Sequence, residues 1–146
     1  MNRKSVLVLV LVLTAAAVGL GGWVLGQSVD KSTTWVSPSG TRLRMLVDKG
    51  TLGGEQVELG EITFAPNADS GEHAHDSIEI FYVLEGELGH VVNGKSDSLK
   101  PGMVGYVRPP DRVRHTTGPA GAKALVIWVP GGESGRITAG RWKREP

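Results

Sequence analysis

The chain has 146 residues, 21 of them glycine and none cysteine, and its 16 Lys and Arg residues nearly balance its 15 Asp and Glu residues. That length allows one compact domain and excludes a multidomain machine. The lack of cysteine excludes a disulfide framework, a cysteine zinc finger, an iron–sulfur cluster and a thiol nucleophile. A net charge of +1 gives no reason to expect a nucleic-acid partner.

An uncharged apolar stretch follows the basic residues Arg3 and Lys4. Residues 6–25 read VLVLVLVLTAAAVGLGGWVL, which as a helix is long enough to cross a bilayer core of about 30 Å. Because the positive charges precede it, the short N-terminus stays in the cytoplasm and the rest is exported. We therefore predict a signal-anchor helix over residues 1–26, with the folded part tethered on the extracytoplasmic side of the membrane.

A cleaved signal peptide is the alternative interpretation of this stretch. Small residues at Ala15–Ala17 suit a cut after Ala17, and a cut after Gly26 is a second option; the product would be secreted or periplasmic. The anchor is favoured because the apolar run continues past the usual length of a signal-peptide core. Without residues 1–26 the chain has 14 basic and 15 acidic residues, so the exported part is nearly neutral.

Residues 27–40 are polar and rich in turn formers, which predicts a linker. A change of side-chain parity between Leu59 and Ile62, beside Gly60, predicts a β-bulge or a bend. No later stretch has a sustained helical period, and strand patterns follow one another at residues 41–47, 56–64, 78–84, 88–92, 96–99, 104–107, 113–117 and 124–129.

Short strands joined by turns, among them the hairpin signal Asn93-Gly94, predict an all-β fold, a small antiparallel β-barrel or sandwich. We place this barrel at residues 41–130. Residues 131–146 form a basic tail, for which we expect a solvated or dimer-edge position. Phe81 and Tyr82 are expected in the barrel core, and His90 at the surface.

Three of the four histidines form a candidate metal site. His73 and His75 have the spacing that places both side chains on one face of an extended strand, and Glu79 has the same parity. His115 belongs to a later strand, which antiparallel pairing would bring opposite the first. Three imidazoles and a carboxylate suit Fe, Mn, Ni, Cu or Zn better than Ca or Mg. The competing interpretation is that His73 and His75 are ordinary polar residues on an exposed strand face.

These residues also resemble the two motifs of the cupins. His73–Glu79 (HAHDSIE), followed by six residues and Gly86, is similar to the first motif, H-x-H, three or four residues, Glu, six residues, Gly. Pro101–His115 is similar to the second, G-x5-P-x-G-x2-H-x3-N. The resemblance covers about residues 42–130. It implies a cupin or jelly-roll barrel, often a homodimer, with one divalent transition metal bound by His73, His75, Glu79 and His115.

The chain departs from the cupin pattern at three places, none of them a ligand. Asn67 replaces the glycine that opens the first motif. In the second motif the strand after Gly102 is longer than usual, Arg112 stands at a common glycine position, and Pro119 replaces the final asparagine. These changes concern the shape of the loops at the mouth of the barrel.

The coordination of the metal decides what chemistry it supports. An octahedral ion with four protein ligands keeps two open positions, which suits Lewis-acid or dioxygen chemistry, whereas a tetrahedral zinc is closed and structural. The free ring nitrogens of the histidines need orienting partners, and the candidates are Asp76, Ser77, Thr116 and Tyr82.

An arginine cluster, Arg108, Arg112 and Arg114, precedes His115. It either attracts a carboxylate or phosphate substrate toward the metal or is a solvated surface, the more common position of charged side chains. Two functions follow: a metal-dependent enzyme of the oxygenase type acting on a small organic molecule, or a non-catalytic metal or small-molecule binding module at the membrane. A sugar isomerase is less favoured, because no further base stands beside the motifs.

Overall fold

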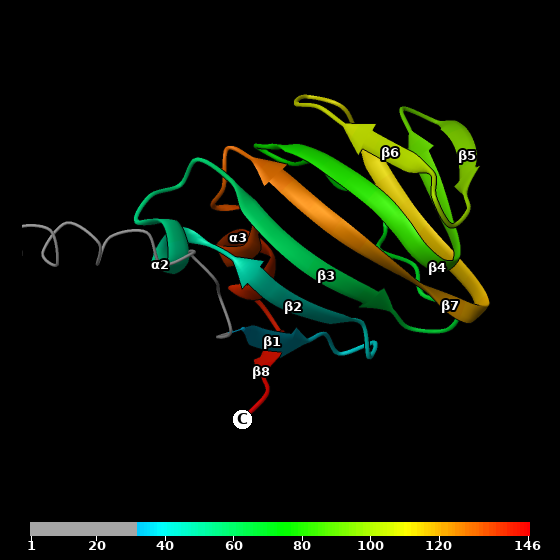
Figure 1. The fold of residues 1–146 in the computed structure, drawn as a ribbon. Helices are drawn as coiled ribbons and strands as arrows, with labels where there is room; N and C mark the ends of the chain where they lie inside the picture. Colours follow the sequence, from blue (N-terminus) through cyan, green and yellow to red (C-terminus); the bar gives the residue numbers. More distant parts are fainter. Residues whose placement is uncertain (1–31) are drawn as a thin grey trace, which may run out of the picture.

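The computed structural model describes residues 32–146, which form a curved antiparallel sheet with two short helices (Figure 1). The strands are β1 (Thr33–Val36), β2 (Arg42–Val47), β3 (Glu58–Phe64), β4 (Ile78–Val92), β5 (Lys95–Leu99), β6 (Val104–Val107), β7 (Val113–Val129) and β8 (Lys143–Arg144); the helices are α2 (Lys49–Leu52) and α3 (Glu133–Thr138). The predicted all-β class is confirmed for this part of the chain.

The predicted signal-anchor helix of residues 1–26 lies outside the described residues. Between residues 32 and 146, no helix has both the length and the apolar character needed to span a bilayer.

The strands are hydrogen-bonded in the order β5-β4-β7-β3-β2-β1-β8, and β6 pairs with β4. The long strands β4 and β7 pair from Ile78 opposite Val129 to Val92 opposite Val113, with register shifts between Val83 and Glu85 and between Gly86 and Leu88. The segments expected separately at 78–84 and 88–92, and at 113–117 and 124–129, are therefore two continuous bent strands. Their bend carries β5 and β6 away from β2 and β3, the curvature of a jelly roll (Figure 1).

Two glycines permit this bend. Gly86 in β4 has φ 73°, and Gly121 in β7 has φ 70°. A Cβ atom on Gly86 would lie 2.3 Å from the carbonyl oxygen of Gly121, and one on Gly121 would lie 2.6 Å from that of Phe64. Both positions thus need a residue without a side chain, for its backbone angle and for the close approach of the strands.

The apolar core lies on the concave face of the sheet. Its fully buried large side chains include Leu43, Phe81, Leu88 and Trp128. Phe81 is a core residue as predicted, whereas Tyr82, the next residue on β4, points to the other face and is 43% exposed. This correction follows from the alternation of side chains along a strand.

The bulge expected at Gly60 lies in the partner strand. The register between β2 and β3 shifts between Met45 and Val47, opposite Gly60 and Leu59. Within β3, Glu58 and Gly60 are buried in regular alternation. Glu58, rather than Leu59, thus faces the interior.

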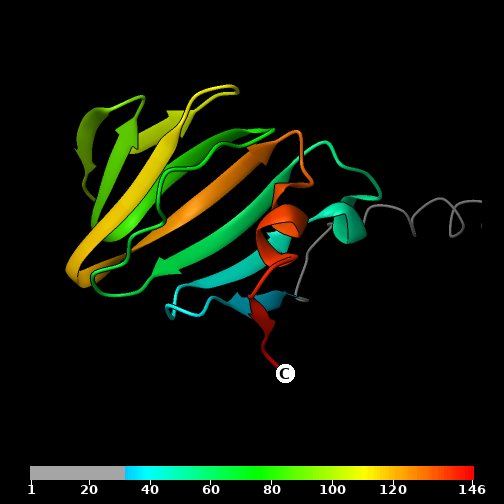
Figure 2. The same cartoon turned by 180° about the vertical axis from the view of Figure 1, so that it is seen from behind.

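Both ends of the described chain belong to the fold. β1, inside the predicted linker, pairs with β2 and with β8, so residues 131–146 are not a solvated tail. Figure 2 shows α3 lying over the face of β2 and β3. The buried Glu58 carboxylate accepts hydrogen bonds from the backbone N and Oγ of Ser134, at 2.9 and 2.8 Å, and so fastens α3 to β3.

We predict that Gly86→Ala destabilises the protein more than Gly94→Ala. Gly94 also has a positive φ, 78°, but nothing lies within 4 Å of a Cβ there, so its variant measures the backbone strain of about 1–2 kcal/mol alone. Gly86→Ala adds a collision with backbone, a further cost of about 1–3 kcal/mol. The free energy of unfolding from urea titration measures both. Equal losses in the two variants would contradict the role given to Gly86.

Candidate functional site

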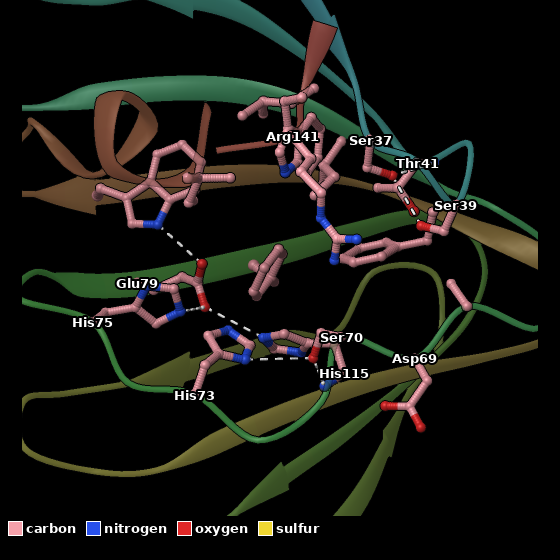
Figure 3. A pocket seen from close by; sticks show the side chains of 18 residues that line it. Ser37, Ser39, Thr41, Asp69, Ser70, His73, His75, Glu79, His115 and Arg141 are labelled. Atoms are coloured by element: carbon pink, nitrogen blue, oxygen red, sulfur yellow. Dashed lines mark hydrogen bonds and ion pairs between the residues drawn. The ribbon is translucent and has the colours of Figure 1, made fainter. Parts of the chain in front are cut away.

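A cavity of about 360 Å³ opens on the concave face of the sheet (Figure 3). Side chains of β2, β3, β4 and β7 line it, together with the segment before β4 and the C-terminal segment after β7. All four predicted metal ligands are among its lining residues: His73, His75, Glu79 and His115.

These four residues reach the cavity from different elements. Glu79 is on β4 and His115 on β7, whereas His73 and His75 precede β4 in an irregular segment. The backbone of His73 makes an isolated antiparallel bridge to Val113, with two hydrogen bonds of 2.8 Å. The two histidines therefore do not share a strand face as expected, and the bridge to β7 holds their segment over the sheet.

The imidazoles gather around one oxygen of Glu79 (Figure 3). Oε2 of Glu79 lies 3.1 Å from Nε2 of His75 and 3.3 Å from Nε2 of His115. The ring of His73 is centred 4.8 Å from that of His75 and 5.8 Å from that of His115. The other oxygen, Oε1, accepts a 2.9 Å hydrogen bond from Nε1 of Trp128. As these side chains stand, no group of three or more His, Asp or Glu between residues 32 and 146 has the spacing of a metal site.

Two of the rings have a fixed orientation. Nδ1 of His75 donates to Oε1 of Glu133 at 3.0 Å, and Nδ1 of His73 donates to the carbonyl of Gly71 at 2.9 Å, since these oxygens are acceptors. In the tautomer that these bonds select, the lone pair lies on Nε2, so Nε2 of His75 does not donate to Oε2 of Glu79, 3.1 Å away, and makes no hydrogen bond. A histidine held by a carboxylate on its far nitrogen is the usual arrangement of a metal ligand.

Glu133 was not among the orienting partners expected from the sequence. Within the described residues, none of those four candidates bonds a ring of His73, His75 or His115. Glu133 starts α3, 58 residues after His75. Its carboxylate also accepts from the backbone N of Asp76 and pairs with Arg136. Only the course of the chain after β7 reveals this contact, so no local pattern would have found it.

The buried charges of the cluster stabilise one another. Burial lowers the pKa of His75, but the carboxylates of Glu79 and Glu133 outweigh burial and raise it above its ordinary value. Burial likewise raises the pKa of Glu79, but the facing imidazoles of His115 and His75 bring it down to about 2. Glu79 is thus a carboxylate at neutral pH, as a ligand to a cation requires.

His90 is buried, which corrects the surface position expected for it. It is 5% exposed, because it pairs with His115 across β4 and β7 and its ring stacks on that of His115 at 5.3 Å. Burial and the neighbouring His115 lower the pKa of His90. It therefore stands behind the cluster as a neutral ring, with Nε2 donating to the carbonyl of Tyr106 at 3.2 Å.

The three arginines predicted to attract substrate do not line the cavity. Arg112 pairs with Glu72 at 3.1 Å, and Arg114 makes a bidentate ion pair with Asp69. Both pairs are on the exposed surface. Arg114 lowers the pKa of Asp69 to about 2, with help from the backbone N–H of Gly71. The guanidinium of Arg108 lies 6.0 Å from the ring centre of Tyr106. Their place in the structure fits the solvated interpretation.

Residues 60–130 match the family model of the cupin domain. This stretch is a cupin domain. Among solved structures, an RmlC-like cupin from Shewanella frigidimarina is 22% identical, with 77% of this chain and 94% of that chain covered and a TM-score of 0.61. The family model thus supports the cupin family for residues 60–130, and the structural likeness supports the cupin fold. A search of the curated proteins gave no match.

Two enzymes have a similar structure. The polyketide cyclase RemF from Streptomyces resistomycificus is 26% identical, with 73% of this chain and 68% of that chain covered and a TM-score of 0.56. An oxalate decarboxylase from Bacillus subtilis, which has Mn(II) centres, is 17% identical, with 79% of this chain and 32% of that chain covered and a TM-score of 0.66. Proteins of one fold differ in function, so these likenesses show the fold.

Proposed function

We propose that the chain binds one divalent transition metal and acts on a small organic molecule in the adjoining cavity. The ligands are His73, His75, Glu79 and His115. The observation that carries the proposal is that Nε2 of His75 and Oε2 of Glu79, both acceptors once Glu133 holds the opposite nitrogen of His75, face each other at 3.1 Å without a hydrogen bond. Two buried acceptors that face each other are costly unless a cation binds between them.

The donor set fits such an ion. Imidazole nitrogens with one carboxylate oxygen suit Fe, Mn, Ni, Cu or Zn, and the Mn(II) centres of the structurally similar oxalate decarboxylase support the proposal. When bound, the ion supplies Lewis-acid or redox chemistry. Trp128 directs Oε2 of Glu79 toward the imidazoles, and Glu133 holds the ring of His75. Phe64 and Phe81 form part of the apolar wall of the cavity beside the cluster.

We predict that the purified full-length chain contains about one transition metal per chain. His75→Ala removes a ligand and should lower the metal affinity at least about tenfold, and Glu133→Gln, which keeps the size but removes the charge that orients His75, should lower it by about tenfold. Elemental analysis and metal titration measure these effects. Unfolding followed by circular dichroism checks that both variants fold.

The matched control is Glu61→Gln, which removes a carboxylate paired with Lys123 away from the cavity. Its metal affinity should equal that of the unchanged chain. A full-length chain that neither contains a transition metal nor binds one on addition would rule out the proposed site.

Catalysis of the oxygenase type is the first proposed activity, because the cavity adjoins the cluster. A non-catalytic binding module is the alternative, favoured by the lack of a second acid–base group: the other carboxylate that lines the cavity, Asp69, is held by Arg114. Oxygen uptake by the metal-loaded chain with phenolic and thiol compounds distinguishes the two. Uptake that is lost in His75→Ala is the result expected of an oxygenase, whereas metal binding without uptake favours the module.

We further propose that the barrel acts outside the cytoplasm, tethered by residues 6–25. The support is the uncharged apolar run behind Arg3 and Lys4. Cell fractionation should find the full-length chain in membranes. A soluble exported product that lacks residues 1–17 or 1–26 would favour signal cleavage instead, and a full-length chain in the soluble cytoplasmic fraction would contradict both. The expected homodimer stays a prediction.

A further inference from the structure

A positively charged side chain enters the cavity from the side opposite the histidine cluster. Arg141 lines the cavity, and Figure 3 shows it across from His73 and His115. Within residues 32–146, Arg141 makes no hydrogen bond or ion pair. Four other arginines pair with carboxylates: Arg42, Arg112, Arg114 and Arg136. A guanidinium without a partner beside a cavity is free to bind an anion from solution.

The position of Arg141 is fixed from both sides. Before it, α3 is fastened by the hydrogen bonds of Ser134 to the buried carboxylate of Glu58. After it, β8 pairs with β1, with Arg144 opposite Trp35. Between these anchors, Trp142 packs against the core. Arg141 therefore belongs to a segment held at the cavity, so binding an anion there does not first require a free tail to become ordered.

Neither carboxylate that lines the cavity neutralises Arg141. Asp69 is paired with Arg114 and accepts from the backbone N of Gly71 at 2.9 Å. Glu79 is surrounded by Trp128 and the histidines on the far side. The negative charges of the cavity are thus already engaged, and the charge of Arg141 remains for a ligand.

The other lining residues define the rest of the ligand. The walls are aromatic and aliphatic, formed by Leu43, Ile62, Phe64, Phe81, Trp128 and Trp142, and hydroxyl groups lie near Arg141, on Ser37, Ser39 and Thr41 (Figure 3). Such walls bind an apolar body. One guanidinium with neutral hydroxyls matches a planar monoanion, whereas a phosphate group calls for more positive charge and more donors.

We propose that the cavity binds a small carboxylate with an apolar body, whose carboxylate pairs with Arg141 and whose body extends toward the histidine cluster. The inference rests on the proposed function, because it takes this cavity as the place where the small molecule binds. A volume of about 360 Å³ is at the low end of the range of small-molecule sites. Arg141 is a substrate-binding residue in this proposal, and the predicted arginine cluster at residues 108–114 is not.

The test is calorimetric titration of the full-length chain with benzoate and hexanoate and with their neutral amides. At least one carboxylate should bind about tenfold more tightly than its amide, the difference expected for a charge-assisted pair. Arg141→Met keeps the length and apolar stem of the side chain but removes the charge, so it should abolish this preference by lowering the affinity for the carboxylate more than that for the amide. Arg141→Lys should keep part of the preference, because the charge remains without the planar fork.

The control is Arg144→Met, which removes one positive charge from the same segment but does not line the cavity. It should keep the preference for the carboxylate. Loss of the preference in Arg144→Met, its survival in Arg141→Met, or its absence from the unchanged chain would overturn the inference.

Metal content is measured on every variant. A chain that holds metal but shows no carboxylate preference would contradict the inference about Arg141 and leave the proposed metal site intact. A chain that shows the preference but binds no metal would contradict the proposed metal site and would still support Arg141 as the anion-binding residue of the cavity.

Discussion

The carboxylate of Glu79 is buried in an apolar barrel, and the surrounding structure supplies what that burial requires. The residue is 3% exposed. Burying an ionised carboxylate in such surroundings costs roughly several kcal/mol of folding free energy unless its oxygens are paired. Trp128 of β7 bonds one oxygen, and His75 and His115 lie against the other. The pairing of β4 with β7 is therefore a requirement of the site as well as of the sheet. Glu79 and Trp128 are directly opposite each other in that ladder.

The same requirement extends to the C-terminal segment. His75, once placed against Glu79, has a second buried nitrogen, Nδ1, which donates a hydrogen bond to Glu133 of α3. Glu133 is in turn paired with Arg136, which also reaches Asp76 at 2.8 Å. The segment after β7 is thus attached to the interior of the barrel by a chain of polar contacts as well as by apolar packing. The polar contacts of this series run from the buried His75 and Glu133 to the exposed Arg136 and Asp76.

The sequence predicted the parts of the fold and site that depend on local pattern. Alternation located the strands, and β6 was predicted with the bounds that the structure shows. The ligand candidates were identified because His73, His75 and Glu79 stand close together in the chain. Their strand-face geometry was wrong, however, because the segment bridges to Val113 instead of extending β4.

Contacts between distant segments were beyond such patterns. Glu58 has no local signal for an interior position, because charged residues are usually exposed, but Ser134, 76 residues later, binds its carboxylate and makes that position stable. The close approach of Gly86 and Gly121, where two long strands bend together, joins positions 35 residues apart and has no local pattern. Asn67, which stands at a glycine position of the cupin pattern, keeps a left-handed backbone with φ 53°. Asparagine tolerates this conformation better than most residues other than glycine.

The boundary of the family match bears on what is particular to this cavity. The match to the cupin family model ends at residue 130, and both Glu133 and Arg141 lie beyond it. The matched part supplies the ligand candidates, the curved sheet and most of the walls, features that one fold offers to many functions. The additional segment supplies the carboxylate that orients His75 and the cation that faces the cavity. Since specificity comes from groups placed against the ligand rather than from the fold, residues 131–146 are where the selectivity of this barrel is to be sought.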